Sequence, residues 1–218
     1  MRSRSFFFPI LCLVVFTASS VLAAGSNRSE PRDPRDEAMM SFNDGIGSRD
    51  RAWSLEKKLA TASATEKKKL EEKIRKAYLA AIRSQRNALR YDSTLFQAHG
   101  ELGYALRKTG DYAAALASYD KALELRPGYA DAIEYRAEAY LGLNRVDEAR
   151  EAYMALHNGG DVTRARMLAE AMTKWLEQRR TDPAGVPAET IDEFATWLTQ
   201  RTEISRATAA SGGAGTWK

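Results

Sequence analysis

The sequence predicts an all-α protein built from stacked helix–turn–helix hairpins. Ala, Leu, Glu, Lys and Arg dominate, while Gly and Pro are sparse between residues 36 and 180. Hydrophobic residues make up 44% of the chain and charged residues 28%, as in a globular protein rather than a disordered or membrane-embedded one. A second observation, an internal repeat with a period of 34 residues, indicates how the helices are arranged.

The N-terminus has the three-part pattern of a secretory signal peptide. Arg2 and Arg4 give a basic start, residues 6–16 are apolar, and Val21 and Ala23 occupy the positions that a signal peptidase reads. The apolar stretch is shorter than the roughly 20 residues that span a bilayer. We therefore expect cleavage after residue 23 and a periplasmic or secreted protein without stable membrane insertion. An uncleaved N-terminal anchor is the alternative.

Cysteine chemistry is excluded from the mature chain. Cys12 is the single cysteine, and it lies inside the expected signal peptide. Disulfides, thiol catalysis and cysteine-bound metal therefore have no residue to use.

The remaining chain divides into a linker, a helical domain and a tail. Residues 24–36 are small, charged and Pro-rich, which predicts a disordered linker. Residues 37–203 form the helical domain, and the Gly-rich end at 204–218 is expected to be a disordered tail. The domain begins with a long, degenerate hairpin over 37–91, because one apolar stripe continues from Leu70 to Ala88 without a turn signal.

Small residues, aromatics and turn residues agree at an offset of 34. Gly103 recurs as Ala137, Ala115 as Ala149, and the turn residue Gly110 as Asn144. Small residues fit where two helices cross closely, since larger side chains would force the backbones apart. Gly and Asn tolerate the left-handed backbone that closes a helix.

This pattern resembles the tetratricopeptide repeat family, whose unit is a helix–turn–helix of about 34 residues. The repeats span 96–129 and 130–163, and the second departs from the pattern at Arg136 and Leu156. The resemblance implies a right-handed solenoid of about three such hairpins. Its structural positions are Gly103, Ala115, Tyr119, Ala122, Pro127, Ala137, Tyr140, Ala149 and Tyr153.

Two further helices are expected to cap the C-terminal end of the solenoid. Residues 158–161 read as a helix stop followed by a new N-cap, and Pro183 and Pro187 punctuate the loop between the two helices. The apolar faces of these helices, within 161–203, would cover the last repeat.

The resemblance also implies where a partner would bind, because the first helix of each repeat lines a concave groove. The side chains expected in this groove are Gln97, Gly100, Glu101, Tyr104, Arg107, Lys108, Asp131, Glu134, Tyr135, Glu138 and Leu141. Some family members hold a C-terminal carboxylate with Lys and Asn, but the matching positions here are Gly100, Tyr104, Glu134 and Glu138. The acidic residues favour a basic or amide-rich segment instead.

Charge is distributed unevenly along the chain. Residues 49–91 hold 13 Lys or Arg against 5 Asp or Glu, whereas residues 92–203 hold 13 against 19. Two interpretations of the basic part stay open, a solvated helix face and a patch for an anionic envelope surface. Nucleic acid is not expected as a partner, because few aromatics accompany the basic residues.

No constellation of residues predicts catalysis. His99 and His157 are the only histidines, and neither has carboxylates at metal-ligand spacing. We therefore expect no enzyme activity, catalytic residue, metal or cofactor. The predicted function is an exported protein–protein interaction module or scaffold of the cell envelope. The alternative is a structural subunit that self-associates, so a homo-oligomer remains open.

Overall fold

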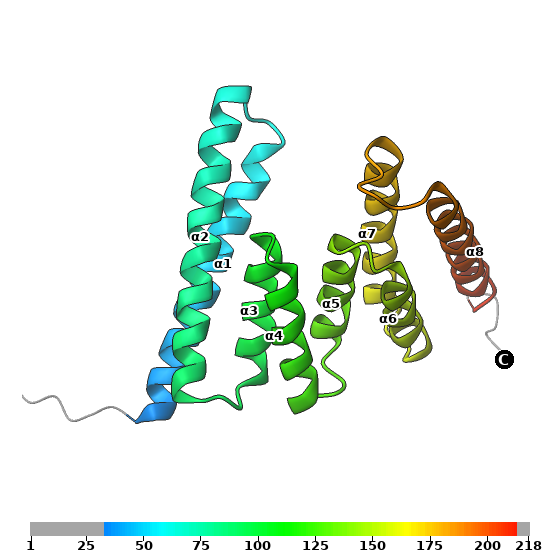
Figure 1. Cartoon of the computed structure of the whole chain (residues 1–218). Coiled ribbons are helices and arrows are strands. Elements are labelled where there is room, and N and C mark those ends of the chain that lie inside the picture. The colour runs from blue at the N-terminus through cyan, green and yellow to red at the C-terminus, as the bar shows by residue number, and fades with distance from the viewer. Residues whose placement is uncertain (1–32, 213–218) are drawn as a thin grey trace, which may run out of the picture. The chain divides into compact units, whose positions relative to one another are not determined.

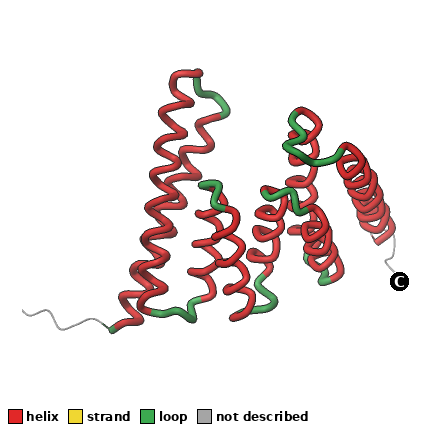
Figure 2. Tube along the Cα trace, in the orientation of Figure 1, coloured by secondary structure: helices red, strands yellow, loops and turns green. Residues whose placement is uncertain are grey.

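The protein folds into eight α-helices without a strand over residues 33–212, which are the residues that this computed structural model describes (Figures 1 and 2). The expected all-α fold is confirmed. The signal peptide expected at 1–23 and most of the expected linker lie outside the described residues. No described helix is both long enough and apolar enough to span a bilayer.

The first hairpin is the longest and consists of α1 (Pro34–Leu59) and α2 (Ala64–Tyr91). Asp33 caps α1, with Pro34 at its first position, so the helix begins before residue 36, where the linker was expected to end. Proline suits this position because its missing N–H has no partner in the first turn of a helix. Ser63 and Glu66 form a reciprocal capping box that starts α2.

The two central hairpins repeat with the predicted period. Helices α3 (Phe96–Lys108) and α5 (Ala130–Gly142) begin and end 34 residues apart, and α4 (Tyr112–Leu125) and α6 (Val146–Asn158) also begin 34 residues apart. Gly110 and Asn144 close the first helix of each hairpin with φ of 87° and 59°. In both turns the next backbone N–H bonds to a carbonyl five residues earlier, as in a Schellman motif.

Small residues allow the paired helices to pack closely. A Cβ atom added to Gly103 would lie 2.6 Å from the ring of Tyr119, which is itself fully buried. Ala115, Ala137 and Ala149 are also fully buried. Among the other expected repeat positions, Ala122 and Tyr153 are buried, Tyr140 is half-buried and Pro127 is exposed in the turn before α5.

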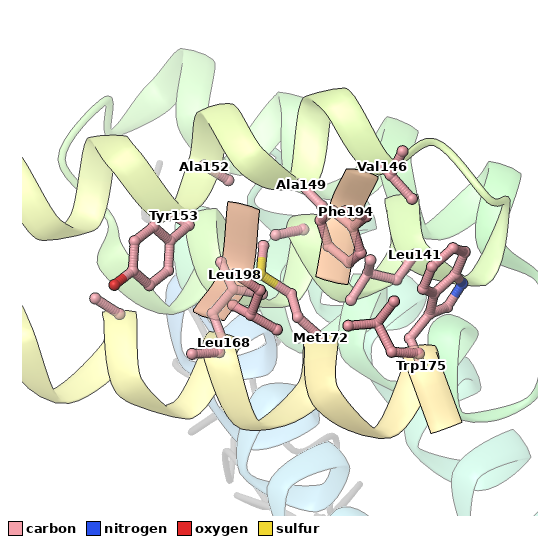
Figure 3. Close-up of a cluster of buried hydrophobic side chains, with 14 of the residues drawn as sticks. Leu141, Val146, Ala149, Ala152, Tyr153, Leu168, Met172, Trp175, Phe194 and Leu198 are labelled. Carbon is pink, nitrogen blue, oxygen red and sulfur yellow. The ribbon is translucent and has the colours of Figure 1, made fainter. Parts of the chain in front are cut away.

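Helix α7 (Val162–Thr181) packs against α5 and α6, and α8 (Ala188–Gly212) packs against α7. Figure 3 shows Phe194 and Leu198 of α8 among Val146, Ala149 and Met172 in one apolar cluster. Part of the expected disordered tail is instead helical, because α8 continues to Gly212. Residues 204–210 contain no Gly or Pro to end the helix, and the Gly pair comes only at 212–213.

The first helices of successive hairpins lie next to one another. Each of the pairs α1 and α3, α3 and α5, and α5 and α7 is in contact. These four helices therefore form one continuous surface, which we call the first-helix face.

Candidate functional site

The expected groove residues lie on the first-helix face, but they differ in accessibility. Gly100, Tyr104, Glu134 and Leu141 are buried. Lys108 is exposed, and the remaining residues are half-buried: Gln97, Glu101, Arg107, Asp131, Tyr135 and Glu138. Several of these side chains contact each other rather than solvent, so the face is more structured than a row of exposed residues.

Ion pairs connect each first helix to the next along this face. The pairs are Arg49 with Glu101 and Lys108 with Glu56 between α1 and α3, Arg107 with Glu138 between α3 and α5, and Arg164 with Asp131 between α5 and α7. Their side chains are 11–39% exposed, which reduces solvent screening relative to a fully exposed pair. The charges expected to meet a partner therefore neutralise one another and fix the alignment of neighbouring hairpins.

Tyr104 of α3 is at the centre of an aromatic cluster to which α1, α2 and α5 also contribute. Its hydroxyl accepts a hydrogen bond of 2.6 Å from Nε1 of Trp53. Its ring centroid lies 5.0 Å from that of Tyr135 and 6.1 Å from that of Tyr78. Because the side chain is buried and bonded, truncating Tyr104 would disturb the packing as well as any binding.

Glu134 is a buried carboxyl on the same face, only 3% exposed. Burial, together with the nearby carboxylate of Glu138, raises its pKa to about 7, although Arg164 and Arg107 oppose the shift. The carboxyl consequently changes charge near neutral pH, at the middle of the first-helix face.

A small hollow of about 180 Å³ opens between α1, α3 and α5. Its lining includes Arg49, Trp53, Tyr104 and Tyr135. The ring of Tyr129 packs directly against Gly100, where an added Cβ atom would lie 2.7 Å from it. Aromatic and Arg side chains are the types that most often anchor a protein partner.

Sequence reasoning missed the contributions of α1 and α7 to this face. Arg49 and Trp53 come from α1, while Arg164, Lys174 and Trp175 come from α7. The sequence did contain a signal for this. First and second helices alternate along the chain, so α1 and α7 are first helices and lie on the same side as α3 and α5. Extending the face beyond the two clear repeats would have identified these side chains.

The basic side chains of α2, the second helix of the first hairpin, lie on the protein surface. All nine Lys and Arg residues of α2 are exposed, and none of the residues from 73 to 91 is acidic. One ion pair on this helix joins Nζ of Lys76 to Glu72 at 2.6 Å. The rest of this charge remains available to solvent or to an anionic surface.

The two histidines make local contacts with residues of the same region of the chain. Nε2 of His99 lies 3.0 Å from the carbonyl oxygen of Ser93, and His157 lies against the ring of Tyr153. Over residues 33–212 no group of three His, Cys, Asp or Glu side chains is placed to hold a metal ion.

Comparison with known families identifies the hairpin formed by α3 and α4. Residues 96–129, which contain α3 and α4, match the tetratricopeptide repeat. No curated protein matches the sequence. The next hairpin repeats the same helix boundaries 34 residues later. The chain is therefore a helical repeat protein that carries a tetratricopeptide repeat at residues 96–129.

Proposed function

We propose that this protein binds a segment of another protein along its first-helix face. Tetratricopeptide repeats are protein–protein interaction modules and are generally non-catalytic. The observation that carries the proposal is the hollow between α1, α3 and α5, where the half-buried rings of Trp53 and Tyr135 border an open space. Such side chains bury a large area and tend to contribute most of the affinity at interfaces.

The proposal rests on the lining of the face more than on its charges. Arg107 and Glu138 are already paired, so a partner gains little by contacting either alone. The side chains of Trp53 and Tyr135 line the hollow and are only partly buried, which leaves apolar area for a partner side chain. An extended or helical segment laid across α1, α3 and α5 would cover them.

Site-directed photocrosslinking tests this proposal. A benzoylphenylalanine in place of Tyr135 samples the first-helix face, and the same residue in place of Tyr91 is the control. Tyr91 is also aromatic and 46% exposed, but it lies at the end of α2. We expect discrete protein adducts from position 135 and none of the same mass from position 91.

The adducts also identify the class of partner. A foreign protein crosslinked at position 135 supports the proposal, and peptide mapping gives the segment that is bound. Adducts between two copies of this chain would indicate self-association instead. Equal crosslinking from the two positions, or none from position 135, contradicts binding on this face.

We further propose that the protein is exported to the periplasm or beyond. The support is the basic, apolar and small-residue pattern of residues 1–23. Fractionation followed by mass spectrometry should recover a chain that begins at Ala24 in the envelope or the medium. Recovery of a membrane-bound form that retains Met1 would favour an anchor, and a cytoplasmic pool that retains Met1 would contradict export.

A further inference from the structure

Four basic residues of α2 are aligned along one side of this helix, which runs without a break from Ala64 to Tyr91 (Figure 1). They are separated by seven residues each: Lys69, Lys76, Arg83 and Arg90. Seven residues make nearly two full turns of an α-helix, so the four side chains follow one line along it. The rise of about 1.5 Å per residue makes this line about 30 Å long. We call it the α2 basic stripe.

The stripe faces away from the core of the first hairpin. Helix α2 packs against α1 and α3, and a buried residue stands two positions before each of the last three stripe residues. These buried residues are Ile74, Ala81 and Ala88. Two positions turn an α-helix by about 200°, so the cations project to the side opposite the core. All four stripe residues are accordingly exposed.

Little negative charge offsets the stripe. Helix α2 has nine basic residues against three acidic ones, and the acids all lie within its first nine residues. Glu72 is 2.6 Å from Nζ of Lys76, whereas Lys69, Arg83 and Arg90 form no ion pair within the described part of the chain. The adjacent α1 has five acidic and five basic residues, so the excess of positive charge belongs to α2.

The stripe lacks the side chains that other macromolecular partners require. A stable protein interface has a core of apolar side chains that is depleted in charge, but no large apolar residue of α2 is exposed between Lys69 and Arg90. Single-stranded nucleic acids stack their bases on aromatic rings, and Tyr78, the aromatic residue in this stretch, is buried. A planar anionic surface needs neither an apolar core nor an aromatic ring.

We propose that the α2 basic stripe binds the surface of an anionic phospholipid bilayer, with α2 lying parallel to the membrane plane. A row of cations about 30 Å long meets many headgroups in one plane, and each Lys or Arg close to such a surface adds to the attraction. The contact is electrostatic and inserts no side chain into the hydrocarbon. This inference goes beyond the proposed function, because no stripe residue lines the hollow between α1, α3 and α5.

Vesicle cosedimentation tests the inference with the chain that begins at Ala24. This chain contains all eight described helices, which belong to one compact unit. It lacks the apolar residues 6–16, which could bind a bilayer of any charge. We expect vesicles of phosphatidylcholine with phosphatidylglycerol to be bound at least about tenfold more tightly than phosphatidylcholine alone. Salt at about 1 M, where the Debye length is about 3 Å, should release the protein.

Removal of charge locates the contact to the stripe. The stripe variant combines Lys69→Gln, Arg83→Gln and Arg90→Gln, and its affinity for the anionic vesicles should fall by at least about tenfold. Glutamine is a good helix former and the three positions are exposed, so circular dichroism should show unchanged helicity.

A control variant removes the same charge from α7. It combines Arg166→Gln, Lys174→Gln and Arg180→Gln, which are again one lysine and two arginines at exposed positions. Helix α7 packs against α5, α6 and α8 rather than against α2. Charges more than a Debye length from the membrane are largely screened, so the affinity of this variant should change by less than about threefold.

Three results would overturn the inference. One is equal binding, or no binding, to the two kinds of vesicle, and another is an equal loss of affinity in the stripe and control variants. The third is binding to a duplex DNA oligonucleotide with none to anionic vesicles, which would identify nucleic acid as the partner. Crosslinking at Tyr135 samples a different surface, so each of these results leaves the proposed function to be judged by its own experiment.

Discussion

The guanidinium of Arg107 pairs with the carboxylate of Glu138 across the boundary between the two central hairpins. Arg107 is 11% exposed and also lies over the rings of Tyr104 and Tyr135. Both charged residues were expected to contact a partner, yet in the folded protein they contact each other. This pair therefore has a structural role that can be measured without a partner.

Breaking this pair should destabilise the fold. Arg107→Met leaves Glu138 without its cation in a partly buried setting, so we expect the unfolding free energy to fall by about 1–3 kcal/mol. The double variant with Glu138→Gln should lose less than the sum of the two single changes. Urea denaturation of the three variants measures this coupling. Lys76→Ala, which breaks an exposed pair on α2, should show no measurable change, and an equal loss there would contradict the structural role.

Two glycines in helix interiors should respond in opposite directions to alanine. Gly103→Ala places a methyl group against the buried ring of Tyr119, and we expect a loss of about 1–3 kcal/mol in unfolding free energy. Gly47→Ala meets no atom within 4 Å and should stabilise α1 by about 0.5–1 kcal/mol, because alanine restricts the unfolded chain more than glycine does. Thermal and urea denaturation measure the change in unfolding free energy for each variant. Changes of the same sign would contradict the close packing of Gly103 against Tyr119.

Glu134 should make stability depend on pH. Its pKa in the folded protein, about 7, lies above the ordinary value of 4.5, so the folded state binds more protons than the unfolded state between these two values. The stability that Glu134 provides is therefore complete below about pH 4.5 and is lost as pH rises through 7. The difference in unfolding free energy between Glu134→Gln and the wild type should therefore shift in favour of the variant by about 1–3 kcal/mol from pH 5 to pH 8. Urea denaturation at the two pH values measures this difference, and a pH-independent difference would contradict the raised pKa.

The C-terminal helix should be essential for the stability of the last repeat. Phe194 of α8 is fully buried among Val146, Ala149 and Met172, so Phe194→Ala should lower the unfolding free energy by about 3–5 kcal/mol. Thr196 lies two residues further along the same helix but is exposed, and Thr196→Ala should change it by less than about 0.5 kcal/mol. A small effect of Phe194→Ala in thermal denaturation would mean that α8 does not cap the stack in solution.

The sequence alone determined the helices, the turns and the repeat. Apolar residues at helical spacing give α2 as one continuous helix, and Gly110 and Asn144 mark the turns that end α3 and α5. The tetratricopeptide repeat at 96–129 could be identified for the same reason. Helix periodicity, caps and left-handed turn residues act over a few positions, so a single sequence is enough to show them.

The tertiary structure decided which side chains of the first-helix face remain available. Tyr104 became a buried centre for Trp53 and Tyr135, while Arg107 and Glu138, 31 residues apart, neutralised each other. The hollow of about 180 Å³ likewise exists only where α1 meets α3 and α5. Helical spacing gives the direction in which a side chain points but not what it meets. Contacts between residues of different hairpins depend on how the hairpins are aligned, and that alignment is set by packing across the whole stack.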